Sequence, residues 1–287
     1  MDRSDKKNII QKMPLPAKID YLKGKALWIR NETLKIHHLT PETRIASCLS
    51  CVEIFAALYY GGVLSFDPRN IRWQQRDRLI VSKAHGAISL YPILADFGFF
   101  GKKGLEKVYG RDSTLGAIPD CLTPGFESIN GSLGHGLGVA CGIALALKNK
   151  KLAASVFVLL GDGELYEGAV WEAIMFAAHH KLDNLILIID KNEKCMLDYC
   201  KNVLDLDPLE NKFKAFNWHA SSVDGHNLKK TYLTLKKLKA TRNRQPKVLI
   251  AHTVKGKGIA RLETDPMCHI KSLTKEEVGQ IIGNTNE

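Results

Sequence analysis

Apolar residues along this chain follow two patterns, which predict two kinds of element. Short apolar runs rich in β-branched residues are typical of strands buried on both faces of a sheet, and we expect strands at 78–82, 155–160, 185–190, 219–223 and 247–253. Apolar residues at helical spacing predict helices at 16–38, 51–61, 89–97, 133–148, 165–181, 207–216 and 228–241. Their alternation predicts an α/β fold with a parallel central sheet and helices on both faces.

Length and composition favour one soluble domain. A chain of 287 residues can bury one large core, so we expect a single domain over 1–287, with 1–15 as a loosely ordered lead-in. Hydrophobic residues make up 45% and charged residues 25% of the chain, as in ordinary globular proteins. No apolar run reaches the roughly 18–20 residues that span a membrane, and the start has no apolar secretion segment.

The net charge of +11 makes nucleic acid one conceivable partner. The basic residues are scattered, or lie in a run at 228–244 whose apolar spacing favours a solvated helix face. We therefore expect no nucleic acid, and anionic small substrates or an acidic partner chain would suit this charge.

The seven cysteines are an odd number, which favours free thiols in a reducing cytoplasm. Cys48-x-x-Cys51 has no second pair at zinc-finger spacing and lies in a helical pattern. We expect these two to be core cysteines rather than metal ligands.

An acid, Asp162, stands between Gly161 and Gly163, where a buried strand ends and a helix begins. Such corners bind anions through free N–H groups and the helix dipole. At about 4 Å and an effective dielectric near 20, a carboxylate would repel a diphosphate by roughly 4 kcal/mol. A Mg²⁺ ion between them reverses the sign, because it takes carboxylate, neutral oxygen and phosphate ligands together. Asp162 therefore predicts a metal-bridged diphosphate.

A second metal ligand is expected at the end of the neighbouring strand. Asn192 follows Asp162 by 30 residues (192 minus 162), after one helix and one strand. A right-handed β-α-β unit places two such strand ends side by side. Asn192 offers a neutral oxygen, and a backbone carbonyl just after it could be a third ligand. Alone, Asp162 could be a helix cap and Asn192 a turn residue, but together they favour a metal site.

These motifs closely resemble the transketolase family. The segments GDGELYEGAVWEA and LDNLILIIDKN match its thiamine diphosphate signature, and SCVEIFAALYYGG, RDRLIVSKAHGAISLYPILADFGFF, TPGFESINGSLGHGLGVACGIALALK and VLIAHTVKGKGIARLETDPMCHIK are also similar to it. The likeness extends over nearly the whole chain. It implies the thiamine diphosphate-binding fold, in the form of a diphosphate-binding domain that stands alone.

The resemblance implies roles for several residues. Asp162 and Asn192 would hold Mg²⁺ or Ca²⁺, with the Lys194 carbonyl as a third protein ligand, and Gly163 would approach the diphosphate by its backbone.

The alternative, a nicotinamide-dependent dehydrogenase, is disfavoured because its G-x-G-x-x-G turn needs a glycine where this chain has Tyr166.

Further residues match the family outside the metal turn. Gly131 and Leu133 would contact the aminopyrimidine by their main chain, and Glu167 matches an acid at the subunit interface. His85 and His269 match histidines near the diphosphate and the reacting carbon, and are suited to proton transfer.

Nothing in the chain corresponds to the family's pyrimidine-binding domain, which carries the glutamate that activates the cofactor. The resemblance therefore implies a split enzyme, in which a C-terminal transketolase-like subunit supplies that domain, with two copies of each chain. A transferase moving a two-carbon unit to an aldehyde or ketone acceptor is then expected. A non-catalytic regulatory or binding subunit is the alternative from another class.

The chain departs from the family at two positions where histidines normally bind hydroxyls of the ketose donor. Arg44 stands in one of them and Ile118 in the other. Either other residues compensate in these loops, or the donor has changed. In the second case Arg44 could pair with a carboxylate or phosphate and Ile118 could line a methyl pocket, as a 2-oxo acid such as pyruvate would need. Sugars, sugar phosphates and 2-oxo acids all remain open as substrates.

Overall fold

A computed structural model describes residues 12–119, 122–129 and 131–284 of the chain. Parallel strands form a central sheet in this part, and each prediction of a strand is confirmed to within one residue at either end. The strands are β1 (Arg78–Val81), β2 (Val156–Gly161), β3 (Leu185–Lys191), β4 (His219–Asp224) and β5 (Lys247–His252). Their order across the sheet is β1-β2-β3-β5-β4, and every pair is parallel.

All seven predicted helices are confirmed, some with shorter bounds than expected. They are α2 (Leu15–Leu39), α4 (Val52–Tyr59), α5 (Leu90–Phe97), α6 (Gly136–Asn149), α7 (Gly168–His179), α9 (Leu209–Ala215) and α10 (Leu228–Ala240). Short helices without a clear periodic signal lie between them: α3 (Ile45–Leu49), α8 (Cys200–Val203), α11 (Ala260–Thr264), α12 (Lys275–Asn284), and the 3₁₀ turns η1 (Ala84–Ser89), η2 (Lys102–Lys107) and η3 (Gly163–Tyr166).

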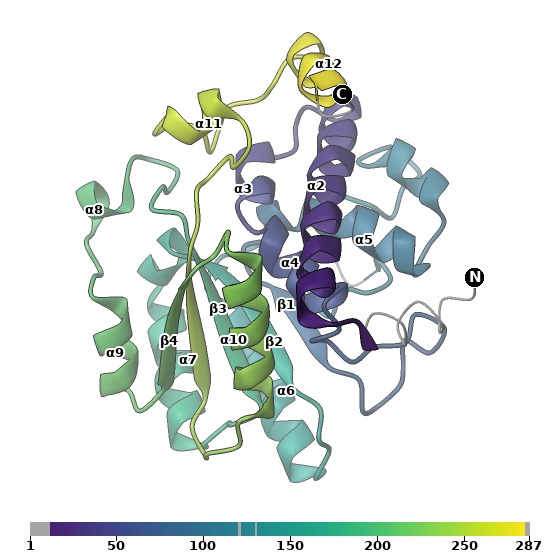
Figure 1. Cartoon of the computed structure of the whole chain (residues 1–287). Helices are drawn as coiled ribbons and strands as arrows, with labels where there is room; N and C mark the ends of the chain where they lie inside the picture. The colour runs from purple at the N-terminus through teal and green to yellow at the C-terminus, as the bar shows by residue number, and fades with distance from the viewer. Residues whose placement is uncertain (1–11, 120–121, 130, 285–287) are drawn as a thin grey trace.

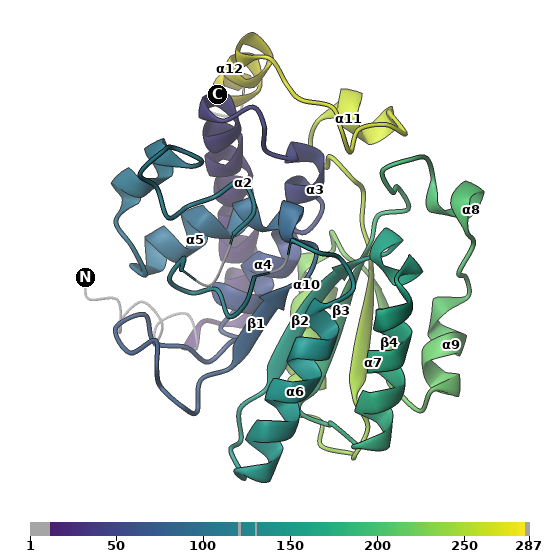
Figure 2. The ribbon, with the colours of Figure 1, turned by 180° about the vertical axis from the view of Figure 1, so that it is seen from behind.

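The sheet is buried on both faces, as its apolar strands predict. Successive residues of one strand enter different cores: Phe157 packs with α2, α4 and α10, and Val158 packs with α6 and α7. Figure 1 shows α10 and the α2–α4 pair on one face, and Figure 2, from behind, shows α6 and α7 on the other. This arrangement is the α/β fold with helices on both faces that the sequence predicts.

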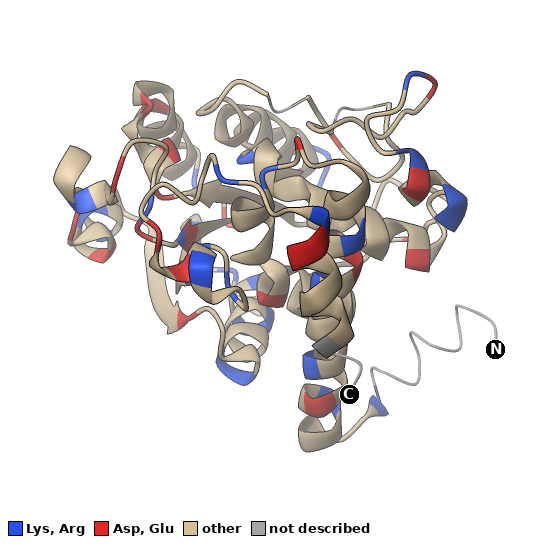
Figure 3. Cartoon of the chain, turned by 90° about the horizontal axis from the view of Figure 1, so that it is seen from above, with Lys and Arg blue, Asp and Glu red and all other residues tan. Residues whose placement is uncertain are grey.

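The carboxyl ends of the strands point toward α3, α8 and α11, at the top of Figure 1. Figure 3 looks down on this end and shows basic and acidic residues interspersed around it. Residues 1–11 of the expected lead-in lie outside the described residues, and α2 already begins at Leu15. Within the described ranges, none of the helices has the length and apolar character needed to cross a bilayer.

Candidate functional site

The turn after β2 holds Asp162 in a buried position, 7% exposed. Its carboxylate accepts hydrogen bonds from the backbone N–H groups of Gly163 (2.9 Å) and Glu193 (2.5 Å). The turn leads first into η3, so α7 begins three residues later than predicted. A Cβ at position 163 would lie 3.0 Å from Cys195 Cβ, so the glycine allows a close approach of the two segments.

Asn192 follows directly after β3, beside this turn. β2 and β3 pair in parallel with Gly161 opposite Asp190, so the two strand ends lie side by side as the spacing predicts. The Asn192 side-chain amide donates to the Asp190 carboxylate (3.2 Å), and its oxygen accepts from the Lys194 N–H (3.3 Å). The bond from Glu193 N–H to Asp162 joins both segments into one structure.

The charge of Lys255 acts on Asp162, but within the described residues the two groups form no ion pair. Burial, and then the neighbouring Asp190 carboxylate, raise the pKa of Asp162 to about 6. Within the residues that the structure describes, no lysine or arginine nitrogen forms an ion pair with it. A buried carboxylate in this state is unfavourable unless a cation compensates it. The donor set of Asp162, the Asn192 amide and the Lys194 carbonyl fits a hard divalent cation.

In the described ranges, no three His, Cys, Asp or Glu side chains gather as metal ligands. Cys48 and Cys51 are buried, and their thiols donate to backbone carbonyls. The prediction of core cysteines is confirmed.

Asp190 and Lys83 form a buried ion pair beneath the site. The Lys83 ammonium pairs with the Asp190 carboxylate, which also accepts hydrogen bonds from the hydroxyls of Ser50 (2.6 Å) and Thr253. Both charged side chains are almost fully buried. Because Asp190 holds the Asn192 amide, this network positions a predicted metal ligand. Sequence reasoning missed it, although a lysine at the end of the apolar run RLIVSK and an aspartate ending LILIID were visible signals.

His85 and His269 come from distant segments, η1 and the turn after α11, and meet at this edge. Their ring centroids are 4.9 Å apart in an edge-to-face arrangement. Burial, followed by nearby positive charges, lowers the pKa of His85 well below its usual range, and lowers that of His269 to about 3. Both rings are therefore neutral at pH 7.

A second lysine that sequence reasoning missed, Lys255, contacts this pair. Its ammonium lies 2.6 Å from the Lys194 carbonyl oxygen and 2.9 Å from His269 Nδ1. It lies in TVKGKG directly after β5, a segment that the resemblance included without assigning a role to the lysine.

Glu164 ties the turn after β2 to the loop before α6. Its buried carboxylate accepts from the N–H of Gly134 (2.9 Å) and from the Ser82 hydroxyl. This contact holds residues 131–135 outside the helix, so α6 begins at Gly136 rather than at Leu133. Gly131 is exposed and Leu133 half-buried in that loop.

Glu167 is exposed. A Cβ added to Gly134 would lie only 2.6 Å from the Cβ of Glu167, so the two residues are in close contact. The same loop therefore packs against the start of α7, close to the predicted interface acid.

The two positions that depart from the family differ in placement. Arg44 precedes α3, and its charge contributes to the lowered pKa values of both His85 and His269, so it lies on the site's side of the molecule. Ile118 is 48% exposed, and no hydrogen bond or ring contact within the described residues connects it with these histidines. The structure brings Arg44 to the site but gives no such evidence for Ile118.

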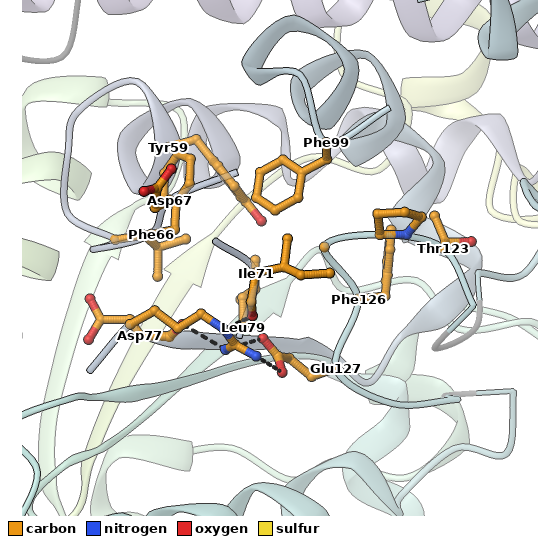
Figure 4. A pocket seen from close by; sticks show the side chains of 14 residues that line it. Tyr59, Phe66, Asp67, Ile71, Asp77, Leu79, Phe99, Thr123, Phe126 and Glu127 are labelled. Atoms are coloured by element: carbon orange, nitrogen blue, oxygen red, sulfur yellow. Dashed lines mark hydrogen bonds and ion pairs between the residues drawn. The ribbon is translucent and has the colours of Figure 1, made fainter. Parts of the chain in front are cut away.

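A pocket of about 280 Å³ opens beside Asp162. It is lined by Tyr166, Lys191, Tyr199, Leu204 and Leu209, among others. Figure 4 shows a smaller pocket, of about 120 Å³, at the amino end of β1, where Arg76 forms an ion pair with Glu127 at 2.7 Å among Tyr59, Phe66 and Phe99. That pocket contains none of the predicted site residues, so it is separate from the candidate site.

Comparison with known proteins agrees with this fold. Residues 46–284 match the family model described as transketolase, thiamine diphosphate binding domain. One subunit of the apulose-4-phosphate transketolase of Actinobacillus succinogenes is 39% identical over 267 residues, which are 92% of this chain and 96% of that protein. The 6-deoxy-6-sulfo-D-fructose transketolase subunit of one Clostridium species is 37% identical over 233 residues, 81% of this chain and 84% of that protein.

Among solved structures, transketolase from Campylobacter jejuni superimposes with a TM-score of 0.83 at 27% identity, covering 91% of this chain. The chain spans 42% of that full-length enzyme. The fold and these matches thus define a thiamine diphosphate-binding protein of the transferase class. The chain belongs to the transketolase family and corresponds to its N-terminal, thiamine diphosphate-binding subunit.

Proposed function

We propose that this chain binds thiamine diphosphate through a divalent metal ion held by Asp162, Asn192 and the Lys194 carbonyl. The observation that carries the proposal is the buried Asp162 carboxylate, whose pKa is raised to about 6 and which pairs with no base in the described residues. Mg²⁺ fits a set of hard oxygen ligands completed by phosphate, and Ca²⁺ is the alternative of the same chemistry.

The remaining predicted contacts surround this metal. Gly163 would present its backbone to the diphosphate, and the main chain of Gly131 and Leu133 would face the aminopyrimidine. When bound, the cofactor supplies the nucleophilic carbon that carries the transferred unit. This chain would orient it and place the neutral rings of His85 and His269 beside the reacting carbon, where they can exchange hydrogen bonds with the donor.

The reaction that we propose is transfer of a two-carbon unit from a ketose donor to an aldehyde or ketone acceptor of sugar type. Two relatives that match most of the chain are named as transketolase subunits for apulose 4-phosphate and for 6-deoxy-6-sulfo-D-fructose, both sugars with an anionic group. Arg44 beside the histidines suits an anion on the donor. The same observation supports the second candidate, acyl transfer from a 2-oxo acid such as pyruvate.

A partner chain is needed for this reaction. The relatives' names as subunits support a C-terminal transketolase-like subunit that supplies the pyrimidine domain and the activating glutamate, and we propose two copies of each chain in the cytoplasm. The exposed Glu167 near the predicted contacts of the aminopyrimidine supports an interface there. Exposed Val139, Met175 and Phe176 on α6 and α7 support a covered face on the same side.

Calorimetry and kinetics of the reconstituted two-chain complex test the proposal. We expect thiamine diphosphate to bind in the presence of Mg²⁺ and to lose affinity when the metal is chelated. The complex should then transfer a two-carbon unit from xylulose 5-phosphate. Turnover of pyruvate instead would select the acyl-transfer alternative, and cofactor binding without any turnover would favour a regulatory subunit. Equal binding with and without metal would contradict the role of Asp162.

A further inference from the structure

Lys255 joins two parts of the site that otherwise have separate roles. Its ammonium group contacts the Lys194 carbonyl (2.6 Å), which is a predicted metal ligand, and Nδ1 of His269 (2.9 Å), which is predicted to face the donor. The residue is only 3% exposed, so these two contacts replace water around its charge. Lys194 lies 61 residues before Lys255 in the sequence and His269 lies 14 residues after it, so the folded chain brings the two partners together.

The chemistry of the pair fixes the direction of the hydrogen bond. Burial, and then the charge of Lys83, lower the pKa of Lys255 to about 8, so the group is still an ammonium at pH 7, with three donors and no acceptor. The atom opposite it must therefore accept, so His269 Nδ1 carries a lone pair and no proton. A neutral imidazole has a single ring proton, which must then be on Nε2.

The surroundings keep the His269 ring neutral. Burial lowers its pKa to about 3, and the charges of Lys255, Arg44 and Lys83 act in the same direction. A second ring proton is thus absent at pH 7, and the tautomer alone decides what the ring offers to a ligand.

We propose that Lys255 is a positioning residue that fixes His269 as the Nε2–H tautomer, so that His269 presents a hydrogen-bond donor to the substrate. The part that concerns substrate rests on the proposed function. Acceptance of a proton from the donor then falls to another group, and His85 has the nearest ring, with its centroid 4.9 Å away. The two histidines would therefore have different roles, although both are neutral.

Nitrogen NMR of the full chain with ¹⁵N-labelled histidine tests the tautomer directly, without cofactor or partner. The chain has ten histidines, and a His269→Asn variant identifies the signals of His269. We expect a single neutral form, protonated on Nε2, at pH 7. A His269 ring protonated on Nδ1, or present as a mixture of tautomers, would overturn the proposal even if every variant of Lys255 failed to fold.

Variants then test whether Lys255 is the cause. Lys255→Met keeps the alkyl chain but removes the donor, and we expect loss of the single tautomer. Lys255→Arg keeps a hydrogen-bond donor at this position and should therefore keep the single tautomer. Lys257→Met, two residues away with a half-buried ion pair to Glu263 at 3.5 Å, should leave the tautomer unchanged. An unchanged tautomer in a folded Lys255→Met chain would refute the role of Lys255.

In the two-chain complex at saturating cofactor, Lys255→Met should lower kcat about 10–100-fold, with partial rescue by Lys255→Arg. An unchanged kcat would overturn the chemical part of the proposal. If the wild-type complex has no transferase activity but His269 shows the single tautomer, the proposed function fails and the positioning role stands. If the complex has transferase activity but His269 shows a mixture of tautomers, the proposed function stands and the positioning role of Lys255 fails.

Discussion

The cofactor side and the donor side of the site are built differently. On the cofactor side, Asp162, Asn192 and Asp190 are buried and connected by hydrogen bonds to several strands. On the donor side, Arg44 is exposed and lies in the loop before α3. The cofactor side matches the family, and a substitution there would disturb many hydrogen-bonded partners. Donor preference can therefore diverge while cofactor binding is retained.

The largest effect should come from the ion pair beneath the cofactor side. Lys83→Met leaves the Asp190 carboxylate buried without its partner, which should cost about 3–5 kcal/mol of unfolding free energy, measured by urea denaturation. Lys23→Met breaks an exposed pair with Asp20 and should cost less than about 1 kcal/mol. The double variant Lys83→Met with Asp190→Asn should recover much of the loss. Equal effects of the two single variants would remove the contrast between buried and exposed charges.

Asp162→Asn should come next, by removing the only charged metal ligand in the proposed set. The affinity for thiamine diphosphate with Mg²⁺ should fall by more than the roughly 10–100-fold that is typical for an outer-shell partner. Titration calorimetry of the two-chain complex measures it. Glu193→Gln removes an exposed carboxylate from the same turn region and serves as the matched control. A comparable loss in both variants would indicate a general charge effect rather than coordination.

The pH dependence of stability gives a third test. The pKa of Asp162 is raised from 3.8 to about 6, so the folded chain holds this proton more tightly than the unfolded chain does. Without metal, stability should therefore fall by up to about 3 kcal/mol as pH rises from 4 through 6. Bound Mg²⁺ and cofactor should recover it, which thermal unfolding at several pH values measures. If the Asp162→Asn variant loses the same stability between pH 4 and pH 6, the effect belongs to another group.

The smallest effect is expected on the donor side. Arg44→Ala should raise KM for an anionic donor roughly tenfold, because a partly solvated charged hydrogen bond contributes about 1–2 kcal/mol. Cofactor affinity should stay unchanged, and Arg44→Lys should keep part of the donor affinity. If Arg44→Ala weakens cofactor binding as strongly as donor binding, Arg44 belongs to the cofactor side and the proposed division is wrong.

The sequence predicts the strands and their carboxyl-end residues well, because burial on both faces leaves a continuous apolar run and the turn acids stand out against it. It predicts the adjacency of Asp162 and Asn192 because one β-α-β unit determines it. The contact of Lys255 with His269 depends on how the segment after β5 folds back through α11, for which a single sequence has no local signal. The late start of α6 has the same kind of cause, since Glu164, 30 residues from Gly134, holds that glycine.

The strand order β3-β5-β4 has a consequence for how the molecule forms during synthesis. β4 leaves the ribosome before β5, yet its only partner in the described sheet is β5, which inserts between it and β3. The nascent chain must therefore carry β4 as an unpaired strand until β5 arrives. The same insertion delivers Thr253 to Asp190 and Lys255 to the Lys194 carbonyl, so closing the sheet and assembling the binding edge are a single late event.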